Sequence, residues 1–338
     1  MAKIPALLQA DPLIQHFQGL GIPLVGQGKV RNTFRISQEL LLAEATDRIS
    51  IFDFVLNGLI PKKGEVLTAL THFWGNTFDC FPHHLIKSEF DPLYNGAYDL
   101  KKKYPSIPLE RCLLVKDLTG ELDGYELIFR MHIGGSVYSV YIKTGIVAGQ
   151  KTTPGLPEWS KLKIAVFTPS TKAETGHDIN VDAKTYFDAN GRKGREFIKM
   201  LRDFYAAAYQ YAKRQGILIL DTKFEGSSSL NIIGDEFLTP DSSRFCDVND
   251  WKKAMKTGSK PKFMDKQFVR NWGMKIETPF GFTGINNLDP ENKEHVDFVH
   301  SLDIPAEIID QTSEKYLEIF YRLTGMKLAD YQKEMMGA

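Results

Sequence analysis

The chain has 338 residues, 43% of them hydrophobic, which is enough to bury a sizeable core in one large domain or in two subdomains that share a cleft. Its 42 basic and 42 acidic residues cancel, so it lacks the net positive charge on which nucleic-acid and membrane-surface binders usually depend. No apolar run approaches the roughly 18 residues that span a bilayer, and the first residues do not form a secretory signal. Three cysteines without a CxxC pair argue against a disulfide framework or a thiolate zinc site. We therefore expect a cytoplasmic, globular protein that binds neither nucleic acid nor membrane.

The first third of the chain is predicted to be rich in strands. An amphipathic helix is expected over residues 1–20, where two glycines end the pattern. Strands are predicted over 33–36 and 40–45, and a helix over 64–81. The segment 90–108 is rich in Tyr, Lys, Pro and Asn and has weak periodicity, so we expect a surface insertion there.

The rest of the chain mixes strands and helices. Strands are predicted over 112–115 and 125–130, and the hinge between two subdomains is expected between them. A Pro/Gly loop over 149–160 follows, and helices are expected over 194–214 and 307–324. This order predicts an α+β protein.

The segment Ile217–Glu225 begins as a continuous apolar run and then alternates, which predicts a strand that leaves the core and enters a cleft. Side chains alternate between the two faces of a strand, so Asp221, Lys223 and Glu225 should point the same way. A turn after Glu225 and a returning strand over 230–234 would complete a hairpin.

The predicted hairpin brings carboxylates together. Pairing of Glu225 with Asn231 would set Asp221 opposite Asp235. Because Mg²⁺ prefers carboxylate oxygens together with substrate phosphates, Glu225 and Asp235 are candidate ligands for a metal–nucleotide complex. The alternative is a solvated hairpin face whose lysine is paired with a neighbouring carboxylate.

A second candidate is the glycine-basic segment Gly26-x-Gly28-Lys29-x-Arg31 at the start of a strand. Glycines allow close backbone approach and cations neutralise phosphate charge, as a phosphate-covering loop requires. The Walker A pattern and the third glycine of a Rossmann fingerprint are missing. An ordinary β-turn with two exposed basic residues is the alternative.

Three further clusters of polar residues lie in predicted loops. They are residues 45–53, with Asp47, Arg48 and Ser50; residues 167–178, with Lys172, His177 and Asp178; and residues 238–244, which end in Arg244. The guanidinium group of Arg244 suits bidentate recognition of a carboxylate or a phosphate. Each cluster also has a structural interpretation, namely a helix cap, a hydroxyl-rich turn and a proline turn respectively.

Together and in this order, these motifs resemble the SAICAR synthase (phosphoribosylaminoimidazole-succinocarboxamide synthase) family. The matching strings are Gly28–Arg31, Ala45–Ser50, Phe167–Glu174 with His177 and Asp178, Asp221–Glu225, and Asp235 and Glu236 with Thr239–Arg244. A weaker similarity extends through 265–270 to 321–325, so the resemblance spans nearly the whole chain.

The resemblance implies an ATP-grasp-like fold of the α+β class. Residues 1–118 would form a small β-rich subdomain that covers ATP, and residues 119–338 an α/β portion that carries the magnesium and ribonucleotide sites. It also implies ATP-dependent ligation of CAIR (5-amino-1-(5-phosphoribosyl)imidazole-4-carboxylate) with L-aspartate through an acyl phosphate, giving SAICAR, ADP and phosphate in purine biosynthesis. The implied cofactor is Mg²⁺, and the implied partners are the small molecules ATP, CAIR and L-aspartate. The sequence does not indicate the oligomeric state.

The resemblance further assigns roles to residues. Those implied to contact ATP are Lys29, Arg31, Lys116 and Glu126, and those implied to hold Mg²⁺ are Glu225 and Asp235. The family's arginine and serine for the CAIR phosphate correspond to Arg130 and Ser136. Implied near the imidazole and its carboxylate, as catalytic residues, are Lys223, Asp221 and Arg244. Implied only for the substrate region are Asp47, Arg48, Ser50, Lys172, His177 and Asp178.

The chain departs from the family's pattern near the expected substrate contacts. The departures are Met131, His132, Ile179 and Cys246, and the hairpin turn is shorter than usual. They leave open a divergent ligase that uses another amine or another acid, and a nucleotide-binding sensor without turnover.

Overall fold

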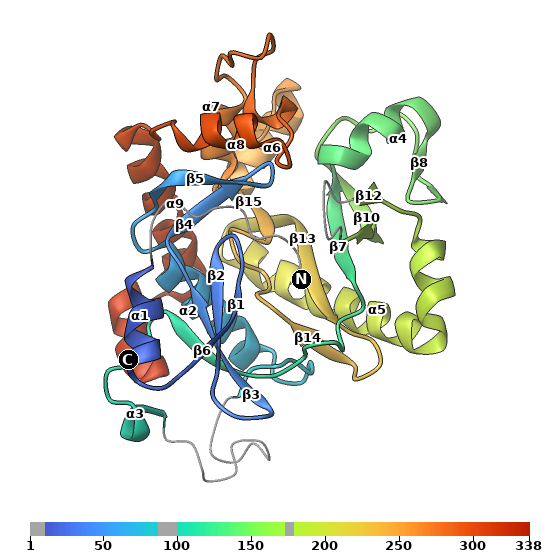
Figure 1. The fold of residues 1–338 in the computed structure, drawn as a ribbon. Helices are drawn as coiled ribbons and strands as arrows, with labels where there is room; N and C mark the ends of the chain where they lie inside the picture. Colours follow the sequence, from blue (N-terminus) through green and yellow to red (C-terminus); the bar gives the residue numbers. More distant parts are fainter. Residues whose placement is uncertain (1–10, 87–99, 173–178) are drawn as a thin grey trace.

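The structure is a computed structural model that describes residues 11–86, 100–172 and 179–338. Its framework is two antiparallel sheets (Figure 1). The first has four strands, in the order β1 (Leu24–Gln27), β2 (Arg31–Arg35), β3 (Leu40–Ala45) and β6 (Cys112–Lys116). This sheet follows the short helix α1 (Pro12–Gly19), which is the described part of the helix expected over 1–20.

The second sheet is built around β7 (Tyr125–Ile133) and β13 (Ile217–Ser227), which pair with each other. Its other strands are β10 (Ser160–Phe167), β11 (Ser170–Thr171), β12 (Ile179–Asn180), β14 (Ile232–Gly234) and β15 (Ser243–Asp247). Strand β13 has three partners, since it pairs with β7, β14 and β15. Side chains from β7 and β15 therefore meet those of β13 on one surface.

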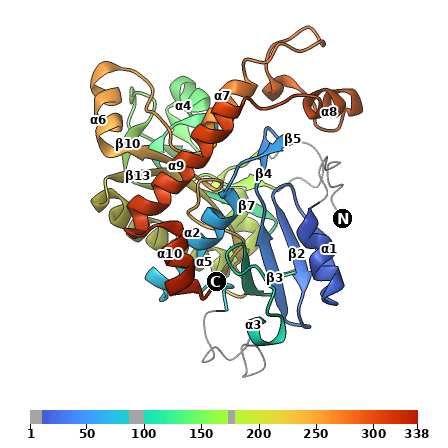
Figure 2. The ribbon, with the colours of Figure 1, turned by 90° about the vertical axis from the view of Figure 1, so that its left-hand side faces the viewer.

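Helices surround both sheets, and Figure 2 shows α9 crossing in front of α2. The helices not yet given are α2 (Lys63–Thr77), α3 (Leu100–Lys103), α4 (Tyr138–Thr144), α5 (Ala183–Arg214), α6 (Val248–Thr257), α7 (Gln267–Gly273), α8 (Lys293–His300), α9 (Ala306–Thr324) and α10 (Leu328–Tyr331). Short helical turns are η1 (Gly135–Val137), η2 (Ile285–Asn287) and η3 (Gln332–Met336). Two small two-stranded sheets pair β4 (Arg48–Ile51) with β5 (Phe54–Leu59), and β8 (Ile146–Val147) with β9 (Gln150–Lys151). In the described residues, no helix has both the length and the apolar character to cross a membrane.

The main core lies between α5 and the second sheet. Phe197, Leu201, Tyr205 and Ala208 are buried at helical spacing on α5, and this face packs on β13. The helix begins earlier than the predicted residue 194, because a kink at Gly191 (φ 57°, ψ −139°) joins a preceding helical segment to it. Glycine reaches this backbone conformation without a side-chain clash.

The α+β class is confirmed, and most predicted elements are found within a few residues. They are the strands over 33–36, 40–45, 112–115 and 125–130 and the helices over 64–81 and 307–324. The insertion predicted over 90–108 is only partly described, since residues 87–99 lie outside the described part. Its described part is not a simple surface insertion, because Leu100 and Ile107 are buried in a core with Phe17 and Phe34.

The predicted register of the hairpin is wrong. Glu225 pairs with Gly234, not with Asn231, and β13 continues to Ser227 before the chain turns. With this register Asp221 does not lie opposite Asp235. The turn is held from outside the hairpin, since the carboxylate of Asp123 accepts hydrogen bonds from the backbone and the hydroxyl of Ser228, both at 2.9 Å.

The division after residue 118 remains our proposal. It falls between β6 of the first sheet and β7 of the second. Strands β4 and β5 precede it, yet their apolar side chains, including Ile51 and Phe54, share a core with Val269 and Val299 from the C-terminal part. The two portions are therefore joined by packing as well as by the chain.

A buried ion pair also joins them, and it gives a first prediction. Lys63 Nζ lies 2.8 Å from Asp241, both side chains are buried, and the hydroxyl of Tyr316 donates to the same carboxylate at 2.7 Å. Burial alone would raise the pKa of Asp241, but Lys63, Lys266 and these hydrogen bonds outweigh it and hold the pKa well below 3.8.

Asp241→Asn should lower the free energy of unfolding by about 3–5 kcal/mol at pH 7, because it leaves Lys63 buried without a counter-charge. The carboxylate has a depressed pKa, so its contribution is complete above the ordinary pKa and is lost as the pH falls through the lower folded value. The gap between wild type and variant should therefore narrow on acidification. Urea denaturation of both proteins at pH 7 and at an acidic pH measures this difference in stability. Asp310→Asn, on the exposed surface of α9, is the control, and equal stabilities of wild type and Asp241→Asn would contradict the prediction.

Candidate active site

Asp221 lies between two guanidinium groups at the centre of the second sheet. It faces Arg130 of β7 and Arg244 of β15 in the strand register. Arg130 Nη1 donates to Asp221 Oδ2 at 2.6 Å, and Arg244 donates to the same oxygen. Two cations thus share one carboxylate, and the excess positive charge suits an anionic ligand.

The surroundings fix both arginines. Arg130 is buried, and its Nε donates to Thr168 Oγ1 at 3.0 Å while its Nη2 lies 3.4 Å from Ser136 Oγ. The guanidinium of Arg244 lies 5.4 Å from the ring centre of Trp159. It also lies against Gly135, where a Cβ atom would come within 3.0 Å of Arg244 Nη1. Arg130, Ser136 and Arg244, which the sequence predicted for one ligand, are therefore brought together.

A second group of charges continues along the same face of β13. Lys223 Nζ lies 2.6 Å from Glu126 and 3.9 Å from Glu225, and Lys172 Nζ lies 2.6 Å from the other oxygen of Glu225. The register of β13 against β7 is unbroken from Asp221 to Phe224, so Asp221 and Lys223 share a face, and Glu225 follows on that face beside Lys223, as the alternation of the strand predicted. The lysine pairs with neighbouring carboxylates, as in the alternative interpretation, but the face is not solvated, because Asp221 and Glu225 are buried.

Lys223 and Glu225 stay charged at neutral pH. Burial would lower the pKa of Lys223, but Glu126 and Glu225 outweigh it and raise the pKa above 10.5. Burial would likewise raise the pKa of Glu225, but Lys223 and Lys172 outweigh it and lower the pKa below 4.5. Glu225 is thus an anion that can exchange a lysine partner for another cation.

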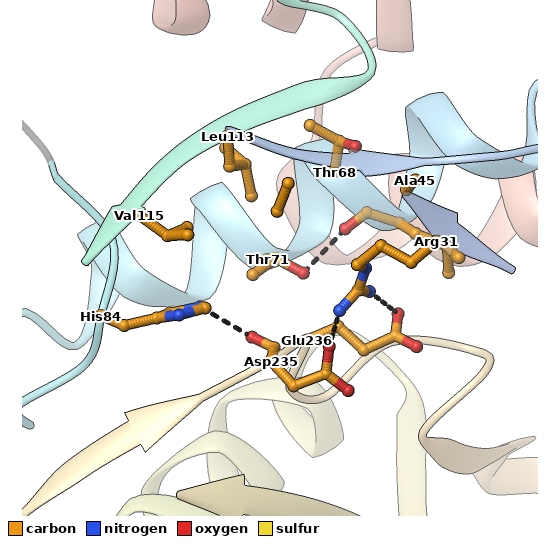
Figure 3. A pocket seen from close by; sticks show the side chains of 11 residues that line it. Arg31, Ala45, Thr68, Thr71, His84, Leu113, Val115, Asp235 and Glu236 are labelled. Atoms are coloured by element: carbon orange, nitrogen blue, oxygen red, sulfur yellow. Dashed lines mark hydrogen bonds and ion pairs between the residues drawn. The ribbon is translucent and has the colours of Figure 1, made fainter. Parts of the chain in front are cut away.

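Arg31 connects the first sheet to the acidic hairpin. Its guanidinium forms ion pairs with Asp235 and, at 3.4 Å, with Glu236 (Figure 3). These three side chains line one end of a small pocket. The rest of its wall comes from α2, β3, β6 and the segment before β6: Ala43, Ala45, Leu67, Thr68, Thr71, His84, Leu113 and Val115. A largely apolar wall with a few charged groups at one end is typical of a small-molecule pocket.

His84 supports Asp235 from within this pocket. Its Nε2 lies 3.0 Å from the carbonyl oxygen of Asp235, as the dashed line in Figure 3 shows. Burial, with Arg31 and His83, lowers the pKa of His84 to about 3, so the ring is neutral and Nε2 carries the proton it donates. The bond fixes Asp235, whose backbone is left-handed with φ 53°.

The remaining predicted residues take other positions. Lys29 pairs with Asp53 at 2.6 Å, and Lys116 is half-buried at the end of β6. Asp47 accepts a hydrogen bond from the backbone of Gly64 at 2.8 Å, so it supports the start of α2. Ser50 is half-buried in β4. His177 and Asp178 lie outside the described residues.

Arg48 does not join the substrate group in this structure. Its side chain is buried and donates to Thr46 Oγ1 at 3.1 Å, to Asn32 Oδ1 at 2.9 Å and to the carbonyl oxygen of Gly28 at 3.3 Å. These contacts hold the guanidinium within the N-terminal portion. The role predicted for Arg48 in the substrate region therefore finds no support in its contacts.

The acidic residues of the hairpin fit Mg²⁺ in donor chemistry. Glu225 pairs with Gly234, the residue before Asp235, so both carboxylates come from neighbouring positions of one hairpin. No three Asp, Glu, His or Cys side chains gather as a metal site among the described residues. Mg²⁺ bound with a nucleotide needs only one or two carboxylates, because phosphates and water complete the shell.

The departures from the family's pattern lie mainly in the core. His132 is fully buried, and its ring nitrogens contact Trp159 O and Tyr209 Oη, each at 3.0 Å. Burial lowers its pKa to about 4, so it is neutral. Met131 and Cys246 are also buried. These three side chains serve packing, whereas the fourth departure, Ile179, is exposed.

Sequence reasoning did not single out two cations on α7. Lys266 precedes the helix and Arg270 lies four residues later, so the two side chains share one face. Neither side chain has a hydrogen bond or an ion pair among the described residues, and Arg270 Nε is buried without a partner. The charges of Asp221 and Arg244 act on the pKa of Arg270, and the charge of Lys223 acts on the pKa of Lys266. Like charges four residues apart on one face are unfavourable, and this is the signal that could have found them.

The pocket and the charged face of β13 adjoin through the hairpin, since Asp235 lines the pocket and Glu225 lies on that face. The structure thus sets a small pocket beside a group of cations whose charge suits an anionic ligand.

Comparison with known proteins gives the family. The family described as SAICAR synthetase matches residues 24–281. Phosphoribosylaminoimidazole-succinocarboxamide synthase of Saccharopolyspora erythraea is 36% identical over 91% of this chain and 96% of its own length, and that of Saccharomyces cerevisiae is 36% identical over 90% and 95%. The chain belongs to the SAICAR synthetase family. It is therefore an ATP-dependent ligase of purine biosynthesis that forms a carbon–nitrogen bond.

Solved structures agree with this assignment. SAICAR synthase from Saccharomyces cerevisiae, solved in complex with SAICAR, superposes with a TM-score of 0.73 at 32% identity, covering 95% of this chain and 99% of that one. A SAICAR synthetase in complex with ADP shares the fold at 18% identity, with a TM-score of 0.57. The α+β fold is thus that of the SAICAR synthases.

Proposed function

We propose that the chain ligates CAIR with L-aspartate through an acyl phosphate, giving SAICAR, ADP and phosphate. The observation that carries the proposal is the continuous charged face of β13. It sets an anion site at Arg130 and Arg244 beside the acidic hairpin that borders the nucleotide pocket. Phosphoryl transfer depends mainly on positioning and on charge stabilisation, and this face supplies both.

In the first step, Arg130 and Ser136 bind the phosphate of CAIR. Arg244 and Lys223 hold its imidazole carboxylate, and Asp221 keeps both arginines in place. A carboxylate oxygen attacks the γ-phosphorus of ATP, forming the acyl phosphate and releasing ADP. The cations offset the repulsion between the two anions as they approach each other. In the second step, the amine of aspartate attacks the acyl carbon, loses a proton as the C–N bond forms, and displaces phosphate.

The nucleotide lies in the pocket beneath the first sheet, with its base against the apolar wall. Lys29 and Arg31 contact its phosphates, while Lys116 and Glu126 contact the nucleotide nearer the hinge. Glu225 and Asp235 would hold Mg²⁺, which neutralises phosphate charge when it is bound. Arg31 and Lys172 now pair with these carboxylates, so they are placed to exchange them for phosphate oxygens.

We further infer a cytoplasmic location, because all three cysteines are described and none forms a disulfide.

We assign the aspartate carboxylates to Lys266 and Arg270, whose side chains have no hydrogen bond or ion pair among the described residues. Lys266 interacts electrostatically with Asp241 and Lys223, and Arg270 with Arg244, Asp265 and Asp221. Arg270→Gln should raise the KM for aspartate by about 10- to 100-fold, which is the loss expected for a charge-assisted hydrogen bond. The KM values for ATP and CAIR should stay within about twofold. Steady-state kinetics with each substrate varied in turn measures this, and Lys275→Gln, at an exposed neighbouring position, is the control. Equal changes in all three KM values would contradict the assignment.

The function itself is tested by incubating the purified protein with CAIR, L-aspartate, ATP and Mg²⁺ and following ADP formation. We expect ADP only when all components are present, and no ADP in the complete mixture would overturn the proposal. A panel with glutamate, alanine and asparagine separates the alternatives. Preference for another amine would indicate a divergent ligase, and tight ATP or CAIR binding without phosphate release would indicate a sensor.

A further inference from the structure

The backbone of the turn Gly28–Arg31 is fastened from one side. Gly28 N donates to Arg31 O at 2.7 Å and closes the turn. The carbonyl oxygen of Gly28 accepts from Arg48 Nη2 at 3.3 Å. The carbonyl oxygen of Val30 accepts from both the backbone N–H and the hydroxyl of Thr46, at 3.0 and 2.9 Å. All three carbonyls are therefore bonded, although the turn itself connects two strands of an edge hairpin.

Asn32 orients the arginine that reaches Gly28. It is fully buried, and its Oδ1 accepts from Arg48 Nη2 at 2.9 Å. Its Nδ2 donates to Glu44 Oε2 at 2.8 Å and to Asp11 Oδ2 at 2.9 Å. The amide oxygen faces a cation and the amide nitrogen faces carboxylates, so only one orientation of the amide satisfies its neighbours. A chain of hydrogen bonds runs from Glu44 through Asn32 and Arg48 to the turn.

Burying this network costs the fold free energy. Glu44 is fully buried and Arg48 nearly so, and one atom of each, Glu44 Oε1 and Arg48 Nη1, is buried with no hydrogen-bond partner in the part of the chain that the structure describes. Burial, reinforced by Asp11, raises the pKa of Glu44 to about 7, although Asn32, Arg111 and Arg48 favour its charge. Apolar residues at these positions would stabilise the sheet at least as well, so the network is better explained by what it holds in place.

We propose that Glu44, Asn32 and Arg48 are positioning residues, which fix the Gly28–Arg31 turn so that Lys29 and Arg31 meet the phosphates of ATP. The inference rests on the ATP site proposed above. It replaces the substrate-region role that the sequence suggested for Arg48.

The need for such a support follows from the contacts of Arg31. In this structure its guanidinium pairs with Asp235 and Glu236, and it must exchange these partners for phosphate oxygens when ATP binds. The exchange is productive only if the backbone beneath the side chain stays still, since small displacements of a binding group cost much of its effect.

Arg48→Lys tests the proposal, because it keeps the charge but loses the fork that joins Gly28, Asn32 and Thr46. We expect the KM for ATP to rise by about tenfold, the loss of a single hydrogen bond to a charged group, with KM values for CAIR and aspartate within about twofold. The matched control is Arg35→Lys on the same sheet, whose guanidinium pairs with Asp117. A lower melting temperature without any change in the KM for ATP would overturn the proposal, since it would show a purely structural role.

Glu44→Gln gives a second measurement that does not depend on Arg48→Lys folding, because the amide keeps an acceptor for Asn32. The groups that face Glu44 are Asp11, Asn32, Arg48, Arg111 and Cys112, and burial raises the pKa of the Cys112 thiol well above 9. In wild type the KM for ATP should rise about two- to fivefold as the pH falls from 8 to 6, because Glu44 gains a proton and Asn32 loses an anionic acceptor. Dividing the KM for ATP of wild type by that of Glu44→Gln cancels the effect of the protonation of ATP itself. A ratio of the two KM values that is constant with pH would overturn the proposal.

These outcomes are separable from the proposed function. Absence of ADP formation by wild type refutes the function. If wild type is active and the variants bind ATP as tightly as wild type, only the positioning role is refuted. ATP binding is measured by calorimetry without the other substrates.

Discussion

Asp235→Asn and Glu225→Gln are expected to lower kcat by about 10²–10³-fold, because each removes a carboxylate that we assign to Mg²⁺. Both substitutions keep the size of the side chain. Asn is the appropriate choice at residue 235, since its backbone has φ 53° and Asn tolerates this left-handed conformation better than most residues. In Glu225→Gln, Lys223 keeps its ion pair with Glu126, so the half-buried ammonium is not left alone.

The measurement is ADP formation at increasing Mg²⁺, together with thermal unfolding. We expect the melting temperatures of both variants to lie within a few degrees of that of wild type. Both variants should need a higher concentration of Mg²⁺ for ADP formation. The control is Glu196→Gln, at an exposed position of α5 where the carboxylate pairs only with Arg192 among the described residues. If both variants turned over like wild type, the metal assignment would be refuted, whereas loss of folding in one would leave the test to the other.

The shared face of the hairpin could be predicted because it depends only on the alternation of a strand. Asp221, Lys223 and Glu225 follow from a period of two, and the unbroken pairing of β13 with β7 from Asp221 to Phe224 and the contact of Lys223 with Glu225 agree with it. The register could not be predicted, because Asp123, a hundred residues away in the chain, fixes the turn through Ser228. A local pattern carries no information on such a bond.

Burial of charged residues is the other limit. Arg48 lies in a string that resembles the family's substrate motif, yet its contacts are with Asn32, Thr46 and Gly28. Conversely, Arg270 looks like an ordinary surface residue of a short helix, and only the fold places it beside the charge of Asp221. Whether a cation is paired or free depends on its tertiary neighbours, and a local sequence pattern does not predict which residues these are.

Arg130→Ala is expected to raise the KM for CAIR by about 10²-fold, the effect of losing a bidentate contact to a phosphate, while the KM for ATP stays within about twofold. Asp221 keeps Arg244 as a partner in this variant, so the remaining carboxylate is not left buried and unpaired. Asp221→Asn should damage the protein more, because it leaves two guanidinium groups facing each other without the anion that separates them.

Separate titrations of CAIR and ATP distinguish a ligand contact from a structural one. The control is Lys163→Ala, which removes an exposed cation from the neighbouring strand β10. Because Arg130 also donates to Thr168 and pairs with Asp221, a mainly structural role would disturb the whole sheet and weaken both ligands alike. Selective weakening of CAIR would locate its phosphate at Arg130, and equal losses for the two ligands would remove Arg130 from the binding site.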